Sequence, residues 1–211
     1  TFWRAGKAAA TSRTSEPSAA GDQPAEQVRI DVAAADDCHL GVLAFGRPLT
    51  LTILPVDAAA LVRDTLADLS EMADRVRVRF SADLPSGLPP VAADGSLLKS
   101  VIWNLAQNGI QTMEKEGGTL RVAARLADGT VDEGPRVVLT LEDEGPGIDA
   151  AHLPRLFEPW FSTKEGGVGL GLAMVKRIVE EHGGRVEAGN REGARGAFFQ
   201  ISLPVPTSPS E

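Results

Sequence analysis

The sequence predicts an α+β fold: a two-layer α/β sandwich with a mixed β-sheet packed on three helices, and an N-terminal appendage that is helical or disordered. Two kinds of segment predict it. Short runs of alternating apolar and polar residues are typical of strands, and longer runs with apolar residues every three or four positions are typical of helices. With 211 residues, 43% of them hydrophobic, the chain has room for one domain with a real core and an appendage.

Two segments precede the predicted domain. Residues 1–26 are rich in Ala, Ser, Thr, Gly and Pro, so they bury too few apolar groups to offset the entropy of ordering, and we expect a flexible linker or part of a helical hairpin. In residues 27–46 apolar side chains recur at helical spacing until a glycine and a proline end the pattern, which predicts a helix. The predicted domain spans 47–204, and the tail 205–211 is expected to be disordered.

The predicted domain contains three helices and a group of strands. Asp57 is the expected N-cap of the first helix, Asp94 that of the second, and the third covers 170–182. Strands are predicted where apolar residues alternate with polar ones, at 76–80, 119–127, 136–143, 185–190 and 196–204.

Composition and charge argue against several classes of partner. The formal net charge is −8, from 29 acidic and 21 basic residues, whereas nucleic acids and anionic membranes need clustered Lys and Arg. No apolar run approaches the ~20 residues that span a bilayer, and no signal-peptide pattern opens the sequence. The single cysteine, Cys38, cannot form an internal disulfide, which indicates a reducing compartment. We therefore expect a cytoplasmic location, and the start at Thr1 indicates a processed or excised piece.

A glycine run, "GGVGLGL" at 166–172, leads directly into the third predicted helix. Its glycines let the backbone approach a ligand, and a helix N-terminus offers unpaired N–H groups and a positive dipole end to an anion. The pattern indicates a phosphate site; the alternative is a glycine-rich turn with a packing role. No strand immediately precedes the run, which disfavours a dinucleotide-binding fold.

Asp143 ends an apolar strand and begins the glycine turn "DEGPGI". A carboxylate at this edge of the sheet can accept a hydrogen bond from an exocyclic amine, and Gly145 and Gly147 leave room for a flat ring, so adenine would fit. The alternative is an aspartate that bonds the backbone of its own turn, as is common before glycine.

Asn104 and Asn108 are four residues apart and share one face of the second predicted helix. That face continues the apolar stripe, so both amides need partners. Amide oxygens can coordinate Mg²⁺, which is usually shared with nucleotide phosphates. The alternative is a hydrogen bond from a single asparagine to a neighbouring loop.

Taken in order, these segments resemble the catalytic and ATP-binding domain of sensor histidine kinases, in the Bergerat-fold or GHKL ATPase superfamily. "WNLAQNGIQTM" resembles the N box, "DEGPGI" the G1 box, "LFEPWFSTK" the F box and "GGVGLGL" the G2 box. The resemblance covers roughly residues 47–204. Two positions depart from the family pattern: Gly109 stands in place of the usual Ala, and Val168 in place of a common Thr.

The resemblance implies a role for each matching residue. Asn108 corresponds to the Mg²⁺ ligand and Asn104 to an amide near the γ-phosphate, while Asp143 corresponds to the adenine-reading aspartate. Lys164 resembles a lysine that reaches the terminal phosphate when a lid over 149–168 closes. The remaining nucleotide-binding positions line the base, anchor the lid or cradle the phosphates: Gly145, Gly147, Ile148, Phe157, Phe161, Gly167, Val168, Gly169, Leu170, Gly171 and Leu172.

The resemblance favours a kinase over a hydrolase. The true ATPases of the superfamily carry a water-activating glutamate one turn before the metal asparagine, and here that position is Asn104, which cannot act as a general base. Phosphoryl transfer by positioning and Mg²⁺ needs no such glutamate. A nucleotide-binding pseudokinase and a GHKL-type ATPase module stay open as alternatives.

The implied partners are ATP or ADP, a histidine-bearing dimerisation domain and a response-regulator receiver domain, with a homodimer expected for the full-length protein. The chain lacks the histidine followed by an acidic residue that would accept the phosphoryl group. His39 precedes Leu40 and is read as a surface or packing residue, and His152 and His182 are weaker candidates still. We therefore expect this piece to bind ATP without labelling itself.

Overall fold

The computed structural model describes residues 49–128, 134–164 and 167–206. The predicted linker at 1–26 and the predicted helix at 27–46 lie outside these residues, as do positions 207–211 of the expected tail. None of the described helices is long and apolar enough to cross a membrane.

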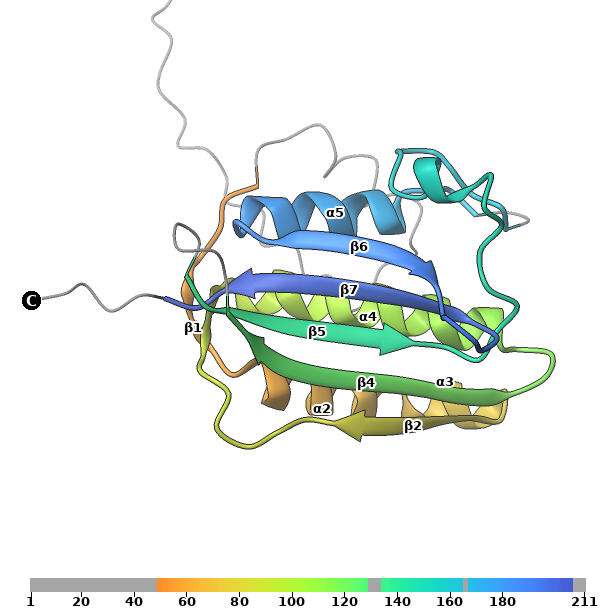
Figure 1. The fold of residues 1–211 in the computed structure, drawn as a ribbon, viewed down its shortest axis with the longest axis horizontal. Coiled ribbons are helices and arrows are strands. Elements are labelled where there is room, and N and C mark those ends of the chain that lie inside the picture. The colour runs from red at the N-terminus through yellow and green to blue at the C-terminus, as the bar shows by residue number, and fades with distance from the viewer. Residues whose placement is uncertain (1–48, 129–133, 165–166, 207–211) are drawn as a thin grey trace, which may run out of the picture. The chain divides into compact units, whose positions relative to one another are not determined.

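A mixed five-stranded sheet forms one layer of the domain, in the order β2-β4-β5-β7-β6 (Figure 1). The parallel pair is β2 (Val78–Asp83) with β4 (Gly118–Ala127). The other pairs are antiparallel and add β5 (Arg136–Glu142), β7 (Ala197–Pro204) and β6 (Arg185–Asn190). Two short strands, β1 (Leu54–Val56) and β3 (Val91–Ala93), form a separate antiparallel pair.

Helices form the second layer. They are α2 (Ala58–Asp68), α3 (Ser70–Arg75), α4 (Gly95–Thr112) and α5 (Gly171–Glu181), with a short 3-10 helix, η1 (Leu153–Arg155). Figure 1 looks onto the sheet with α4 behind it. The buried side chains of α2, α4 and α5 join those of the sheet in one apolar core, so the α+β two-layer prediction is confirmed.

Both predicted aspartate N-caps are confirmed. Asp57 accepts a hydrogen bond from the backbone N–H of Ala60 at 2.9 Å, and Asp94 accepts from those of Ser96 and Leu97 at 3.0 and 3.2 Å. These bonds satisfy N–H groups that have no partner inside the helix, which is why each helix begins where its aspartate stands.

The first predicted helix divides in two, so the described residues contain four α-helices and not three. Leu69 is the C-cap of α2 and the N-cap of α3, and its side chain is fully buried. The helix is interrupted at this residue, whose side chain packs into the core. Local periodicity does not reveal such an interruption. Strands β1 and β3 were not predicted either, because three residues are too few to show alternation.

Candidate functional site

The carboxyl group of Asp143 is buried where β5 ends, with 4% of the residue exposed. Its Oδ1 accepts hydrogen bonds from the backbone N–H groups of Gly145 at 2.8 Å and Ala197 at 3.3 Å. Burial raises the pKa of Asp143 above its ordinary value, whereas these two hydrogen bonds and the positive charge of Arg191 lower it. Since both bonds go to Oδ1, the described residues leave Oδ2 without a hydrogen bond of its own.

Helix α4 contacts both the N-terminus of α5 and the aspartate turn. A Cβ placed on Gly171, the first residue of α5, would lie 2.8 Å from the amide oxygen of Asn104 on α4. The amide nitrogen of Asn104 donates to the carbonyl of Ser100 at 3.1 Å, which orients that oxygen toward α5. A Cβ on Gly109, further along α4, would lie 3.7 Å from the Cβ of Asp143. The asparagine helix therefore contacts the glycine helix at Asn104 and the aspartate turn at Gly109.

The N-terminus of α5 is free of a side-chain cap. Its N-cap residue, Leu170, makes no side-chain hydrogen bond to the first turn, and Leu170 itself is buried. The unpaired N–H groups and the positive end of the helix dipole suit an anion such as a phosphate.

Asn108 lies one turn beyond Asn104 and contacts the lid. The ammonium of Lys164 donates to Oδ1 of Asn108 at 2.8 Å and to Oε1 of Gln111 at 2.5 Å. Desolvation lowers the pKa of Lys164, although the residue as a whole is exposed. Two amide oxygens thus already hold a cation, which fits the preference of Mg²⁺ for oxygen ligands.

Residues 149–164, the described part of the predicted lid that precedes the gap, contact the glycine run. The backbone N–H of Trp160 donates to the carbonyl of Gly169 at 2.9 Å. Gly169 has φ +74°, and a Cβ there would lie 2.6–2.7 Å from the backbone of Trp160 and Phe161, so this position requires glycine. The lid and the phosphate-cradle candidate are therefore in direct contact.

The two lid anchors contact different partners. Phe157 packs against the core, whereas the ring of Phe161 lies 5.5 Å from that of His152 and 4.8 Å from the guanidinium of Arg155. Phe161 therefore contacts other residues of the predicted lid, around η1, whereas Phe157 attaches this segment to the rest of the domain. Two of the predicted apolar positions, Ile148 and Leu172, also pack against the core.

The remaining predicted positions lie in the same region. Gly167 is next to Ser162 and Lys164, since a Cβ there would lie 2.4 Å from the Ser162 hydroxyl and 3.3 Å from Lys164. Val168 follows it and is half-buried.

Sequence reasoning missed the β6–β7 turn, residues 191–196, and the residue before it. Asn190 pairs with the backbone of Ile148 twice: its Oδ1 accepts from the N–H and its Nδ2 donates to the carbonyl, both at 2.7 Å. Arg191 donates to the carbonyl of Asp143 at 3.2 Å. No local pattern indicates that this turn contacts the distant "DEGPGI" turn.

His182 has a structural role. It is 6% exposed, its Nε2 accepts from the backbone N–H of Asp94 at 2.9 Å, and its Nδ1 lies 2.7 Å from the carbonyl of Ile178. With both ring nitrogens engaged in the fold, it does not serve as a phosphoacceptor. His152 packs on Phe161, and His39 lies outside the described residues.

The two-layer fold and the meeting of α4, the turn after β5 and the N-terminus of α5 define the Bergerat class of nucleotide-binding domain. Residues 93–207 match the family described as histidine kinase-, DNA gyrase B- and HSP90-like ATPase. Because this match covers more than half of the chain, the chain belongs to that family, and its domain is an ATP-binding domain of the histidine-kinase type.

Similar proteins are sensor kinases. The chain is 36% identical over 166 residues to the sensor histidine kinase ZraS of Escherichia coli (strain K12), covering 78% of this chain and 34% of ZraS. Among solved structures, full-length ShkA in complex with AMPPNP gives a TM-score of 0.69 at 30% identity, covering 81% of this chain and 35% of ShkA. The histidine kinase ThkA in complex with the response regulator TrrA gives 0.64 at 25% identity, covering 78% and 45%. The chain spans well under half of each of these relatives.

Proposed function

We propose that this chain is the ATP-binding catalytic domain of a cytoplasmic two-component sensor histidine kinase. The single observation that carries the proposal is the convergence of Asn104, Asp143 and the uncapped N-terminus of α5, which are far apart in the sequence. In this role the domain holds ATP while the γ-phosphoryl group moves to a ring nitrogen of a histidine on a dimerisation domain. The bond from the γ-phosphorus to the bridging oxygen breaks, and ADP remains.

Each part of the nucleotide has a matching group. Oδ2 of Asp143 would accept a hydrogen bond from the exocyclic amine of adenine, and Gly145, Gly147 and Ile148 would border the ring. The phosphates would lie at the N-terminus of α5, within reach of Asn104, with the glycines from 167 to 171 around them.

The Asn108 oxygen would hold Mg²⁺ once Lys164 has moved away from it and from Gln111. The ion, when bound, would neutralise charge that develops on the phosphates. Lys164 would then be free to reach the terminal phosphate, which is the role the resemblance implies.

The absence of a carboxylate at position 104 favours transfer to histidine over hydrolysis. The Asn104 amide donates to Ser100 and turns its oxygen to α5, and an amide cannot take a proton from water. ShkA and ThkA are structurally similar, and ThkA was solved with a response regulator, which supports a receiver domain as the downstream partner.

The decisive experiment supplies the missing acceptor. The chain is mixed with a separate helical hairpin that carries the phosphoacceptor histidine of a related kinase, together with Mg²⁺ and γ-labelled ATP. We expect acid-labile, base-stable label on the hairpin and none on the chain alone. Steady release of inorganic phosphate without the hairpin would favour the ATPase alternative, and ATP binding without either product would favour a pseudokinase.

Asn108→Ala tests the metal assignment. Because this variant removes the proposed ligand oxygen, we expect ADP affinity to lose its dependence on Mg²⁺ while affinity in EDTA stays within about twofold, since a twofold change is below 1 kcal/mol. Calorimetric titration of ADP with and without Mg²⁺ measures both. An undiminished response to Mg²⁺ would remove Asn108 from the metal site.

A further inference from the structure

We propose that Arg191 is a positioning residue for base recognition: it fixes the turn that carries Asp143 and keeps a positive charge beside that carboxylate. This inference rests on the proposed function, because it concerns how Asp143 would be held for adenine. It assigns a role in nucleotide binding to the β6–β7 turn, which lies outside the N, G1, F and G2 boxes.

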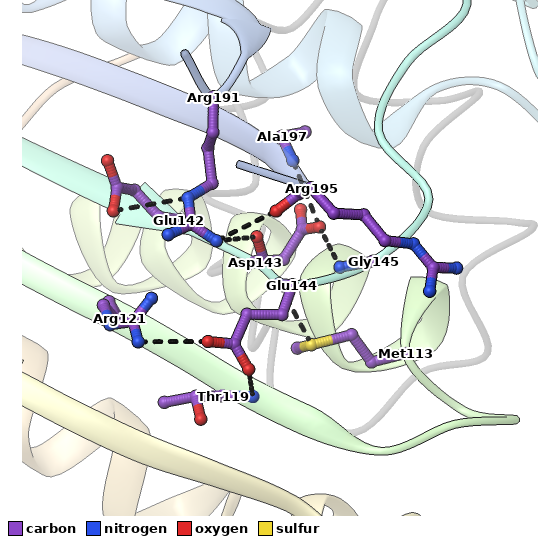
Figure 2. A network of polar contacts seen from close by, with 10 residues as sticks. All are labelled: Met113, Thr119, Arg121, Glu142, Asp143, Glu144, Gly145, Arg191, Arg195 and Ala197. Atoms are coloured by element: carbon purple, nitrogen blue, oxygen red, sulfur yellow. Dashed lines mark hydrogen bonds and ion pairs between the residues drawn. The ribbon is translucent and has the colours of Figure 1, made fainter. Parts of the chain in front are cut away.

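Arg191 holds two segments with one guanidinium. Its Nη1 donates to the carbonyl of Asp143 at 3.2 Å and to that of Arg195 at 3.0 Å, and its Nε lies 3.7 Å from the carboxylate of Glu142 (Figure 2). The Arg191 side chain is 15% exposed, so these bonds compete little with water. The guanidinium therefore connects the end of β5 to the β6–β7 turn.

The turn is shaped so that it approaches Asp143 closely. The N–H of Arg191 donates to the carbonyl of Gly196 at 3.0 Å, which closes the turn. Gly196 has φ +117°, and a Cβ there would lie 1.8 Å from the carbonyl oxygen of Asp143. Next to it, the N–H of Ala197 donates to Oδ1 of Asp143. Loss of Arg191 would therefore loosen the same turn that orients the carboxylate.

Arg191 is also the charged group that acts on Asp143. Among the described residues packed around Asp143, α4 contributes the uncharged Gly109 and Thr112. The carboxylate of Glu144 is turned away to the N–H of Thr119 and to Arg121, each at 3.0 Å. Glu142 pairs with Arg191 itself. Arg195, which Figure 2 also draws, pairs with Glu116.

The charge of Arg191 has a predictable effect on ligand binding. The positive charge lowers the pKa of Asp143, against the larger effect of burial, which raises it. Without Arg191 the pKa of Asp143 would rise further, so the carboxyl group would stay protonated up to a higher pH. In that form it could not accept the adenine hydrogen bond with its full negative charge.

The test compares Arg191→Gln, Arg191→Lys and the matched control Arg195→Gln in the whole chain. ADP affinity in EDTA is measured by calorimetry from pH 5 to pH 8, and folding is checked by near-ultraviolet circular dichroism. We expect Arg191→Gln to bind ADP about tenfold more weakly at pH 7, the size expected for one charge-assisted contact. We also expect its acid-side loss of binding to move to higher pH. Arg191→Lys keeps the charge, so its pH profile should stay in place with a smaller loss.

Arg195→Gln controls for the loss of an arginine from the same turn, because its side chain pairs with the exposed Glu116 and not with Asp143. It should bind ADP like the parent chain. Equal affinity and an equal pH profile for parent and Arg191→Gln would overturn the inference, as would equal losses in all three variants. If Arg191→Gln does not fold, Arg191→Lys provides the test. A pH profile for Arg191→Lys that differs from the parent's would overturn the inference, and an unchanged pH profile would support it. If the parent chain does not bind ADP, the proposed function itself fails.

Discussion

At the residue scale, Asp143 uses one carboxylate oxygen in the fold and, in the proposed function, would offer the other to a ligand. Oδ1 accepts two backbone hydrogen bonds, and the described residues leave Oδ2 without one. Burial disfavours the charged form of this carboxyl group. In the proposed function this position would therefore trade stability for binding.

Asp143→Asn should expose that trade-off. The amide oxygen can still accept from Gly145 and Ala197, so the turn should keep its shape. The amide nitrogen cannot accept from the exocyclic amine of adenine, and a hydrogen bond to a charged group is worth about 1.5–3 kcal/mol, so we expect ADP affinity to fall about 10- to 100-fold. Calorimetry at pH 7 measures it, and an unchanged affinity would remove the adenine assignment.

The same substitution should not lower stability at neutral pH. Burial raises the pKa of Asp143 in the folded chain, so its contribution to stability is fully present below the pKa of the unfolded chain and is lost as the pH rises through the folded value. At pH 7 the ionised group disfavours folding, and Asn removes this penalty. We expect a Tm equal to or above the parent's at pH 7 and no such advantage near pH 3, measured by thermal melts. A clear drop in Tm at pH 7 would contradict this.

The packing around Gly109 explains why a glycine occupies this position. In the sequence it is only a departure from the usual alanine of the family. A Cβ at this position would lie 2.7 Å from a methyl group of Leu120, so the usual alanine would require Leu120 to move. The glycine therefore allows α4 to lie close to the sheet beside Asp143.

At the scale of elements, the lid contacts both α4 and the glycine run. Lys164 bonds the same Asn108 oxygen that we assign to Mg²⁺, so a metal-bound nucleotide and this lysine contact exclude each other. Lid opening at Lys164 would then be part of nucleotide binding.

Lys164→Met should separate two roles of the lysine. Removing the ammonium frees Asn108, so we expect affinity for Mg²⁺ and ADP to rise about two- to fivefold, the size of an exposed polar contact worth up to about 1 kcal/mol. For ATP the gain should be smaller or reversed, because the lysine would also lose its contact with the terminal phosphate. Parallel titrations with ADP and ATP measure the difference.

Gln111→Ala is the matched control for this prediction. It removes the second acceptor of Lys164 without touching Asn108 or the lysine. It should raise the affinity for ADP and ATP alike. Weaker ADP binding by both variants would contradict a lysine that competes with the metal.

At the scale of the whole molecule, the two helices of the site are tied together at their far ends. His182 ends α5, and its ring accepts from the N–H of Asp94, the N-cap of α4. Asp94 in turn accepts from the N–H of Thr52 at 3.0 Å. This chain of hydrogen bonds sets how α5 lies on α4, and so how Gly171 meets Asn104.

His182→Ala should therefore act mainly through stability. It leaves the partly buried N–H of Asp94 without its partner, which costs about 1–3 kcal/mol and should lower the Tm by about 2–10 °C for a chain of this size. His152→Ala is the control, because His152 packs on the lid and not between the helices. Equal melting temperatures for the parent and His182→Ala would rule out this role.

Much of the fold could be predicted from the sequence, because its signals are local, and the proposed site was predicted from the same local motifs. Asp57 and Asp94 mark helix starts by their own side-chain bonds, and 185–190 was predicted with the bounds that β6 has. The break at Leu69 could not be predicted, since it depends on burial against distant residues. The roles of Gln111, Asn190 and Arg191 depend on contacts with residues 42 to 53 positions away.

The sequence by itself determined the class of fold and the order of the four boxes. Periodicity, caps and glycine spacing act within a few residues, so they can be read along the chain. Only the tertiary structure decided that Lys164 rests on the Asn108 oxygen, that His182 joins the two helices, and that Arg191 supports Asp143. The physical reason is that a buried polar group bonds whichever partner the packed core brings within reach, and sequence separation does not encode that distance.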